Sequence, residues 1–354
     1  MAKRTPPVRA SIVDVARLAR VSIGTASRVI NAHPAVLPAN ITAVRQAMAT
    51  LGYHPAAPEN RRGRRRRVPP ASATRVALLL LGPYDLTWMT DRSPVYSYVM
   101  HGIQRAVAAW GGDLLVRHLP TWAAATDLWQ SQQPTGAILF GAEPEDAIPP
   151  VLTTMPAVWV MGSPRRFTGD HLLPDHRRIG LLAAEHLLTN GHRVCGFLGW
   201  DLTRADARIT DGTLRGQAFG AALTAAGGRL IAVPQDGLYD HDQNRTDDRV
   251  LGARLEKLFA HDPRPTALFL GMDAYAPSVY RWLHQRGLRP GHDVAIVTCN
   301  NERPFLTGLD PAPVVIDIHA DHLGVRAVEH LRWRIANPQA AAEQVLIAPR
   351  LITP

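Results

Sequence analysis

From residue 75 onward, short apolar runs alternate with segments of helical periodicity, and this alternation restricts the fold more than any other feature of the chain. Continuous apolar runs are typical of parallel strands buried on both faces, and the segments between them are typical of the helices that cover such sheets. The runs span 76–81, 113–118, 137–140, 157–161, 194–198, 230–233, 267–270 and 294–299, and the helices are expected near 96–110, 179–190, 214–226, 248–261, 275–286 and 321–337. About 280 residues is large for one such sheet, so the pattern predicts two α/β lobes.

Before these lobes, residues 11–31 have the pattern of two short helices joined by a tight turn. Ser11 is expected to cap the first helix, because Asp14 follows three residues later in a variant of the capping box. Ser22 is expected to cap the second helix, and Ala26 within that helix is expected to point inward. The side chains left on the outer face of the second helix are those of Ser22, Ile23, Thr25, Ser27 and Arg28.

This outer face has the chemistry of a helix that enters the major groove of DNA. Hydroxyl groups and the amide groups of a helix N-terminus bind phosphates, and an arginine pairs with guanine. Ile23 suits thymine methyl groups, whereas Gly24 offers no side chain, so less sequence is expected to be read there. A small helical hairpin with no role in DNA binding is the alternative interpretation.

The same stretch resembles the helix-turn-helix of the LacI/GalR bacterial repressors, whose pattern is roughly Asp-Val-Ala-x-x-Ala-x-Val-Ser-x-x-Thr-Val-Ser-Arg-Val-x-Asn. Residues 14–31 fit this spacing, with Ala26 in place of Val inside the core of the pattern. Residues 51–55 match the family's Leu-Gly-Tyr-x-Pro signature. The resemblance implies a DNA-binding surface that includes Ser11, Ser22, Ile23, Gly24, Thr25, Ser27, Arg28, Asn31 and Tyr53.

A third helix is expected from about residue 38 to residue 51, which would complete a three-helix bundle. Pro38 suits a first helical position, and Gly52 suits the residue after a helix end. Members of the family usually have Ser or Thr before this helix, where Leu37 stands here. A slightly weaker helix start is therefore expected, because a leucine cannot cap the free amide groups.

Positive charge is concentrated in the N-terminal part of the chain. Residues 1–70 hold thirteen Lys and Arg but two acidic residues, a net charge of +11. The whole chain carries +9, so the remaining residues carry −2. Phosphate binding through release of counter-ions needs a local field of this kind, whereas a generally basic protein would spread the charge.

The segment after the third helix departs from the family. The hinge helix of the family typically reads Asn-x-x-Ala-Arg-x-Leu, and its Leu enters the minor groove at the centre of the operator. Here that position falls at or near Arg62, and Pro58 and Gly63 both disfavour a helix. Two interpretations stay open: Arg61, Arg62 and Arg64 to Arg67 grip phosphates or a narrow minor groove, or the segment is a solvated basic linker.

The resemblance extends more loosely over the lobes. Residues 175–193, 265–273 and 293–301 look like family segments, as do Pro311 to Ile316 followed by Leu323-Gly324. The resemblance implies a periplasmic-binding-protein-like core of two Rossmann-like lobes, crossed by three strands, with a cleft for a small effector. The domains expected are a helix-turn-helix domain at 1–57, an Arg-rich hinge at 58–74 and an effector-binding and dimerisation core at 75–354, with lobe 1 at about 75–175 and 318–338 and lobe 2 at about 176–317 and 339–354.

Candidate effector-binding residues follow the predicted strands. Ligands of open parallel sheets bind outside the carboxyl ends of the strands, at a topological switch point. Tyr84, Asp85, Asp273 and Asn300 satisfy this rule, and Trp200 and Tyr96 suit stacking against a sugar or a base. Arg215 begins a segment similar to the family's Arg-x-x-Gly-Phe-x-x-Ala-Leu, whose Arg often holds sugar hydroxyls or a charged group.

Each candidate also has an alternative role. Asp273 and Asn300 suit caps of turns, Arg215 suits an exposed helix start, and Trp200 suits packing between lobes. The polar set favours a sugar or a nucleoside-like effector, because such ligands need matched donors and acceptors. Asn300 and Asn301 replace the family's paired Asp, and Met272 replaces an Asn, so an atypical effector is expected.

The sequence offers no recognisable catalytic constellation. It has no phosphate-binding loop, no Gly-x-Ser-x-Gly and no His-Glu-x-x-His, so no catalytic, metal or cofactor residue is expected. His171, Asp175 and His176 suggest a metal cluster only weakly, since a loop at the lobe boundary explains them. Cys195 and Cys299 lie in apolar runs and are expected to be buried free thiols. Without a signal peptide or a membrane-spanning stretch, a cytoplasmic protein is expected.

These features together predict that the chain is an effector-responsive DNA-binding transcriptional regulator that acts as a repressor. A homodimer is expected to bind a palindromic operator in double-stranded DNA, and a tetramer is left open. Two rivals remain. One is an architectural DNA binder without a ligand, and the other is a sugar-modifying enzyme fused to a helix-turn-helix.

Overall fold

The computed structural model describes residues 10–30, 36–54, 74–162, 164–199, 202, 211–233, 239–240 and 245–354. Contacts divide the chain into two compact units, Met1–Ala71 and Ser72–Pro354, each of which is considered by itself. In the part of the chain that is described, no helix has both the length and the apolar character needed to cross a membrane.

The first unit is a three-helix bundle of α1 (Ile12–Leu18), α2 (Ile23–Ile30) and α3 (Pro38–Thr50). Ser11 and Asp14 form the expected capping box, and the Ser22 side chain accepts a hydrogen bond from the Thr25 amide at 3.0 Å. Leu37 makes no capping hydrogen bond, as expected. The helices enclose a small apolar core, whose buried members are Val15, Ala16, Ala26, Val44 and Ala47.

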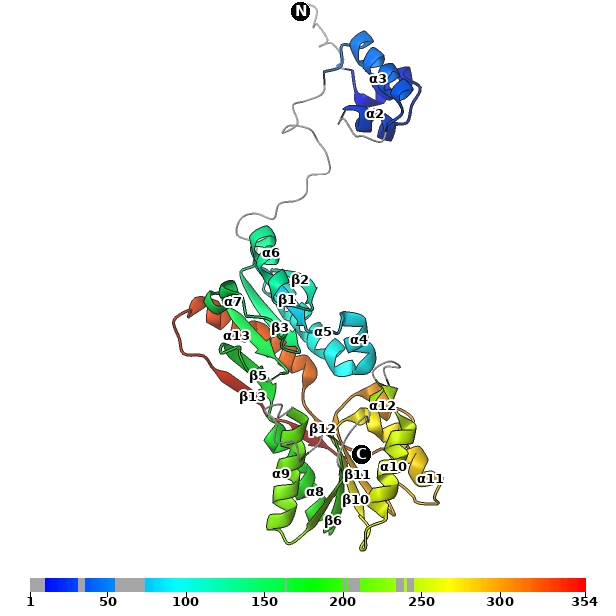
Figure 1. Ribbon diagram of the computed structural model, residues 1–354, viewed down its shortest axis with the longest axis vertical. Coiled ribbons are helices and arrows are strands. Elements are labelled where there is room, and N and C mark those ends of the chain that lie inside the picture. The colour runs from blue at the N-terminus through cyan, green and yellow to red at the C-terminus, as the bar shows by residue number, and fades with distance from the viewer. Residues whose placement is uncertain are drawn as a thin grey trace, which may run out of the picture. The chain divides into compact units, whose positions relative to one another are not determined.

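The second unit contains two six-stranded sheets, each of which forms the centre of one lobe (Figure 1). The first sheet has the order β13-β5-β4-β3-β1-β2, and all its neighbours are parallel. Its strands are β1 (Arg75–Leu81), β2 (Asp113–Leu119), β3 (Gly136–Gly141), β4 (Ala157–Val160), β5 (Asp170–Pro174) and β13 (Gln344–Ile347). The helices of this lobe are α4 (Leu86–Arg92), α5 (Pro94–Ala109), α6 (Ala123–Gln132), α7 (Pro150–Thr154) and α13 (Ala320–Ala336).

The second sheet has the order β14-β12-β11-β10-β6-β7 and is parallel except between β12 and β14. Its strands are β6 (Val194–Leu198), β7 (Arg229–Ala232), β10 (Ala267–Leu270), β11 (Ala295–Asn300), β12 (Val314–Asp317) and β14 (Arg350–Ile352). Its helices are α8 (His176–Thr189), α9 (Asp211–Ala225), α10 (Asp248–Phe259), η2 (Asp273–Tyr275), α11 (Ala276–His284) and α12 (Arg303–Leu306). A short antiparallel pair, β8 (Tyr239–Asp240) and β9 (Arg245–Thr246), lies between β7 and α10 in sequence.

Both faces of the first sheet are covered, which explains the continuous apolar run of β1. Leu78 and Leu80 pack into the core beneath α5 and α13, whereas Leu79 and Leu81 pack on the opposite face with Trp122 of the α6 side. Successive side chains of a strand point to opposite faces, so a strand between two helical layers must be apolar throughout. The predicted two-lobed architecture is confirmed.

The chain passes between the lobes three times: after β5, after β12 and between β13 and β14. The prediction that residues 339–354 lie wholly in lobe 2 is wrong for β13. Residues 344–347 pair with β5 in the first sheet, and only β14 joins the second. The pattern did not separate them, because the two strands are short and only two residues apart.

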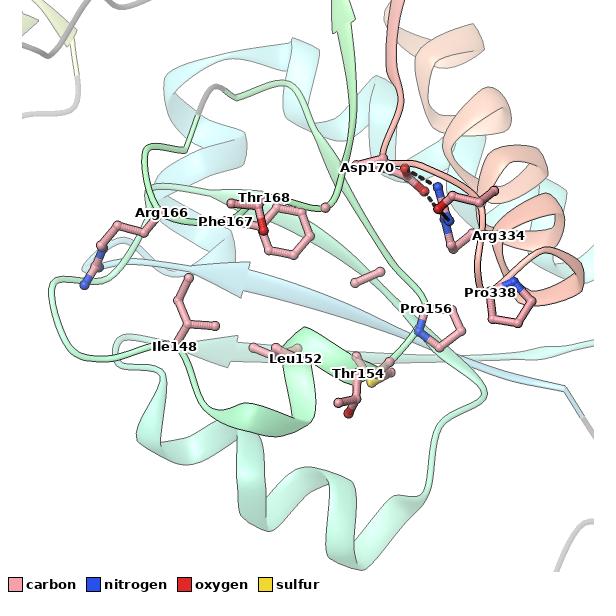
Figure 2. Close-up of a pocket in the computed structure, with 15 residues that line it drawn as sticks. Ile148, Leu152, Thr154, Pro156, Arg166, Phe167, Thr168, Asp170, Arg334 and Pro338 are labelled. Atoms are coloured by element: carbon pink, nitrogen blue, oxygen red, sulfur yellow. Dashed lines mark hydrogen bonds and ion pairs between the residues drawn. The ribbon is translucent and has the colours of Figure 1, made fainter.

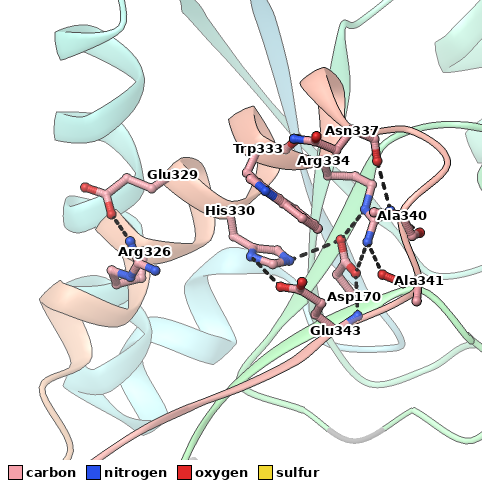
Figure 3. A network of polar contacts seen from close by, with 10 residues as sticks. All are labelled: Asp170, Arg326, Glu329, His330, Trp333, Arg334, Asn337, Ala340, Ala341 and Glu343. Carbon is pink, nitrogen blue, oxygen red and sulfur yellow. Dashed lines mark hydrogen bonds and ion pairs between the residues drawn. The ribbon is translucent and has the colours of Figure 1, made fainter.

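A buried ion-pair network fixes the start of β5 to the end of α13 (Figure 3). Arg334 donates to both carboxylate oxygens of Asp170, at 2.6 and 2.7 Å, and to the backbone carbonyls of Ala340 and Ala341. Burial opposes ionisation of Asp170, but the hydrogen bonds from Arg334 and from the Glu343 amide lower its pKa. The network therefore anchors the segment that leads into β13.

Candidate functional site

The outer face of α2 presents most of the side chains that the sequence nominates for DNA contact. Ile23, Gly24 and Arg28 are exposed, and Ile23 keeps 51% of its surface although it is apolar. The side-chain oxygens Ser22 Oγ and Thr25 Oγ1 are hydrogen-bonded at the helix start, 2.9 Å apart. An exposed apolar residue beside hydroxyl groups and an arginine suits the edges of base pairs in a major groove.

The remaining nominated residues of this unit differ in their surroundings. The Ser11 hydroxyl lies 2.6 Å from an Asp14 carboxylate oxygen and serves the cap of α1. Tyr53 is half-buried and packs against the core of the bundle. Ser27 is half-buried on α2. Asn31, Arg61 and Arg62 lie outside the described residues, as does most of the proposed hinge.

In the second unit, Arg215 and Asn300 meet at the carboxyl ends of the strands of lobe 2. Arg215 Nη1 donates to Asn300 Oδ1 at 3.0 Å and to the Gly271 carbonyl at 2.7 Å. Its Nε donates to His176 Nδ1 at 3.1 Å. Arg215 is only 5% exposed, so the alternative of an exposed arginine at a helix start is excluded.

Asp273 lies in the same cluster and is completely buried. It accepts hydrogen bonds from Thr298 Oγ1 at 2.7 Å and from the Glu302 amide at 2.6 Å. Burial, reinforced by the nearby Glu302 carboxylate, raises the pKa of Asp273 well above its ordinary value. Burial raises the pKa of Glu302 as well, and burial next to Arg215 lowers that of His176, which favours the neutral imidazole.

Three of the predicted effector-binding residues belong to lobe 1. Tyr84 stacks on Trp88 with ring centroids 3.6 Å apart, and Asp85 is the N-cap of α4, where it accepts from the Trp88 amide at 2.9 Å. Tyr96 packs against Phe140. Trp200 lies outside the described residues. The structure therefore brings Arg215, Asp273 and Asn300 into one cluster. Tyr84, Asp85 and Tyr96 belong to lobe 1, where the Tyr96 amide donates to the Ser93 carbonyl at 3.1 Å.

Three members of the cluster were not among the predicted effector-binding residues: Ser93, His176 and Glu302. Ser93 donates to Glu302, whose other carboxylate oxygen accepts from Asn300 Nδ2 at 3.0 Å. Glu302 follows the Asn-Asn pair at the end of β11, so the rule that selected Asn300 could also have found it. Among the residues that the structure describes, no group of three or more His, Cys, Asp or Glu is arranged to hold a metal ion.

A separate pocket of about 230 Å³ lies in lobe 1 between α7 and the end of α13 (Figure 2). It adjoins the first residues of β4 and β5, whereas ligands of parallel sheets bind at the opposite, carboxyl ends. Its charged groups are held by the protein: Asp170 pairs with Arg334, and Arg166 donates to the Asp146 carbonyl at 2.9 Å. This pocket is therefore a poorer candidate for the effector site than the cluster around Arg215.

The raised pKa of Asp273 predicts a pH-dependent stability. A carboxyl whose pKa is higher in the folded state adds stability in acid, and this stability is lost as the pH rises through the folded value. Relative to the Asp273→Asn variant, the free energy of unfolding of the natural protein should fall from mildly acidic to neutral pH. Urea titrations across this range measure it, with the exposed Asp127→Asn as a control that should follow the natural profile. Parallel profiles for Asp273→Asn and the natural protein would contradict the prediction.

Family models match both units of the chain. The model for bacterial regulatory proteins of the lacI family matches residues 11–56, and the model for a periplasmic binding protein-like domain matches residues 184–353. The ribose operon repressor of Escherichia coli (strain K12) is 27% identical over 362 residues, which cover 97% of this chain and 98% of that protein. The HTH-type transcriptional repressor PurR of Mannheimia succiniciproducens is 25% identical over 362 residues, with 97% of each chain covered.

Solved structures show the same fold along nearly the whole chain. A complex of the transcriptional regulator CelR with cellobiose is 23% identical, covers 98% of this chain and 99% of its own, and has a TM-score of 0.62. The lac repressor dimer bound to operator and the anti-inducer ONPF is 20% identical, covers 97% and 98%, and has a TM-score of 0.63. The two family models together match more than half of the residues, in the order and with the folds described above. The chain belongs to the LacI family of bacterial regulatory proteins.

Proposed function

We propose that this protein is an effector-responsive repressor that binds a palindromic operator as a homodimer and acts in the cytoplasm without catalysis. The observation that carries the proposal is the outer face of α2, where Ile23, Gly24 and Arg28 are exposed at a helix start capped by Ser22. The net charge of +11 over residues 1–70 supplies the field that attracts DNA. Two such faces in a dimer would read two half-sites.

The domain boundaries of the proposal are residues 1–57 for DNA binding, 58–74 for the hinge and 75–354 for the core. Arg61 and Arg62 are proposed to contact phosphates or the minor groove. Arg215, Asp273 and Asn300 are proposed to line the effector site, together with Tyr84, Asp85, Tyr96 and Trp200. A sugar or nucleoside-like effector suits this site, because buried donors and acceptors select ligands with matching hydroxyl groups.

Selection of bound sites from random duplex DNA at near-physiological salt tests the DNA-binding part. A palindrome with two defined half-sites is expected. Enrichment of no motif, with salt-sensitive binding to every duplex, would instead support an architectural DNA binder. Hydrolysis of ATP in the presence of candidate sugars would support the fused enzyme.

The selected duplex then tests Arg28. Arg28→Ala should weaken binding to this duplex by about 1–3 kcal/mol, roughly 5- to 150-fold, and relax the preference at one position of each half-site. Arg17→Ala is the control, because Arg17 is 77% exposed on α1 and carries the same charge. It should weaken preferred and random DNA equally. If Arg28→Ala, like Arg17→Ala, lost the same affinity for preferred and for random DNA, base recognition by Arg28 would be excluded.

A further inference from the structure

A chain of hydrogen bonds runs from the candidate effector site in lobe 2 to a helix of lobe 1. Arg215 Nη1 donates to Asn300 Oδ1, and Asn300 Nδ2 donates to Glu302 Oε2, each at 3.0 Å. The other oxygen, Glu302 Oε1, accepts from Ser93 Oγ and belongs to a carboxylate that also accepts from the Val95 amide. This relay of Arg215, Asn300, Glu302 and Ser93 thus joins groups that are far apart in sequence.

The last link of the relay crosses from one lobe to the other. Ser93 is the residue before α5 in lobe 1, and Glu302 follows β11 in lobe 2. Both are buried, and Glu302 is 0% exposed. The Glu302 carboxylate contacts the first turn of a sixteen-residue helix, where free amide groups and the helix dipole favour a negative charge. Hydrogen bonds that an ionised carboxylate accepts are charge-assisted and therefore stronger than bonds between neutral groups.

The residue types of the relay are matched to one another. A guanidinium group only donates hydrogen bonds and a carboxylate only accepts them, so the side chain between Arg215 and Glu302 must do both. An asparagine amide has one acceptor and two donors. An aspartate, which the family pattern has at this position, would place a second carboxylate against Glu302. The departure at Asn300 is therefore explained by the glutamate two residues later.

We propose that Glu302 is a positioning residue that latches lobe 2 to α5 of lobe 1 and couples the effector site to the angle between the lobes. The coupling rests on the proposed function, because an effector that binds Arg215 or Asn300 competes for the atoms of the relay. Such a ligand changes the hold of Glu302 on Ser93 and the Val95 amide. This gives the differential contact that a two-state transition between lobe arrangements requires.

Amide hydrogen exchange of the full chain tests the latch without DNA or effector. Glu302→Ala and Asn300→Asp should each raise exchange in the first turn of α5 by about tenfold or more, because the Val95 amide loses its buried acceptor or the acceptor is repelled. Exchange around Asp170 and Arg334 should stay unchanged. The double variant Asn300→Asp/Glu302→Gln restores a donor–acceptor match and should return exchange to within about twofold of the natural chain.

Ser93→Ala keeps the Arg215, Asn300 and Glu302 side chains and reports on the latch even where a Glu302 variant does not fold. It should raise exchange in the first turn of α5, whereas the exposed Ser97→Ala on the same helix should not. Unchanged exchange in Ser93→Ala, or no rescue in a folded double variant, would overturn the latch. Failure of the operator selection would overturn the proposed function and leave these exchange results standing.

Discussion

Replacing Arg334 with Met should lower the free energy of unfolding by about 3–5 kcal/mol, because it leaves the buried Asp170 carboxylate without its partner. Asp170 is 1% exposed and receives two hydrogen bonds from the guanidinium group. Arg334 also donates to carbonyls of the segment before β13, and these would lose their donors. Urea unfolding of the full chain measures the loss.

Arg178→Met is the matched control for this prediction. Arg178 and Glu185 form an ion pair at 2.8 Å on the surface, with side chains 44% and 55% exposed. Water and salt screen such a pair, so the loss should be only about 0–1 kcal/mol. If the two variants lost similar free energy of unfolding, burial would not be what determines the contribution of the Asp170–Arg334 pair to stability.

Replacing Ala26 with Asp should abolish operator binding while the lobes stay folded. Ala26 is completely buried between the helices of the first unit, and an unpaired charge there costs several kcal/mol. A bundle of this size has little stability to lose. The expected outcome is a drop in affinity for the selected duplex of about a thousandfold or more, equivalent to loss of the specific component of binding.

The same substitution at Ala49 is the control, because Ala49 is exposed on α3 and its replacement leaves the bundle core intact. A charge near a helix C-terminus costs only about 0.3–1 kcal/mol. The assignment of Ala26 to the core of the DNA-binding unit would be contradicted by near-natural operator affinity of Ala26→Asp. It would also be contradicted if Ala26→Asp and Ala49→Asp lost operator affinity to the same degree.

Strong local patterns made much of the fold predictable from the sequence. The capping residues Ser11 and Ser22 lie where the sequence places them, since their effect depends only on the next three residues. The apolar run of β1 identified a strand covered on both faces. By contrast, β5 begins with Asp170, and a charged residue does not indicate a buried strand unless its partner, Arg334, is known. The helices α4 and α6 were also not predicted, because neither has a clear apolar stripe.

The cluster around Arg215 was only partly predictable from the sequence for a related reason. Arg215, Asp273 and Asn300 were found because a rule about strand ends and a family pattern both selected them. Glu302 and Ser93 were missed because their significance depends on a contact between residues 209 positions apart in the chain. No local pattern records a contact of that separation.

The chain passes between the lobes three times, and this limits which parts of the protein recombination can exchange between relatives. The first sheet draws strands from β1 through β13, and the second from β6 through β14. Any single recombination point between β1 and β14 therefore leaves at least one sheet with strands from both parents. An effector preference contained in one lobe cannot be exchanged between relatives as one continuous gene segment, whereas the helix-turn-helix unit, which is continuous in sequence, can be.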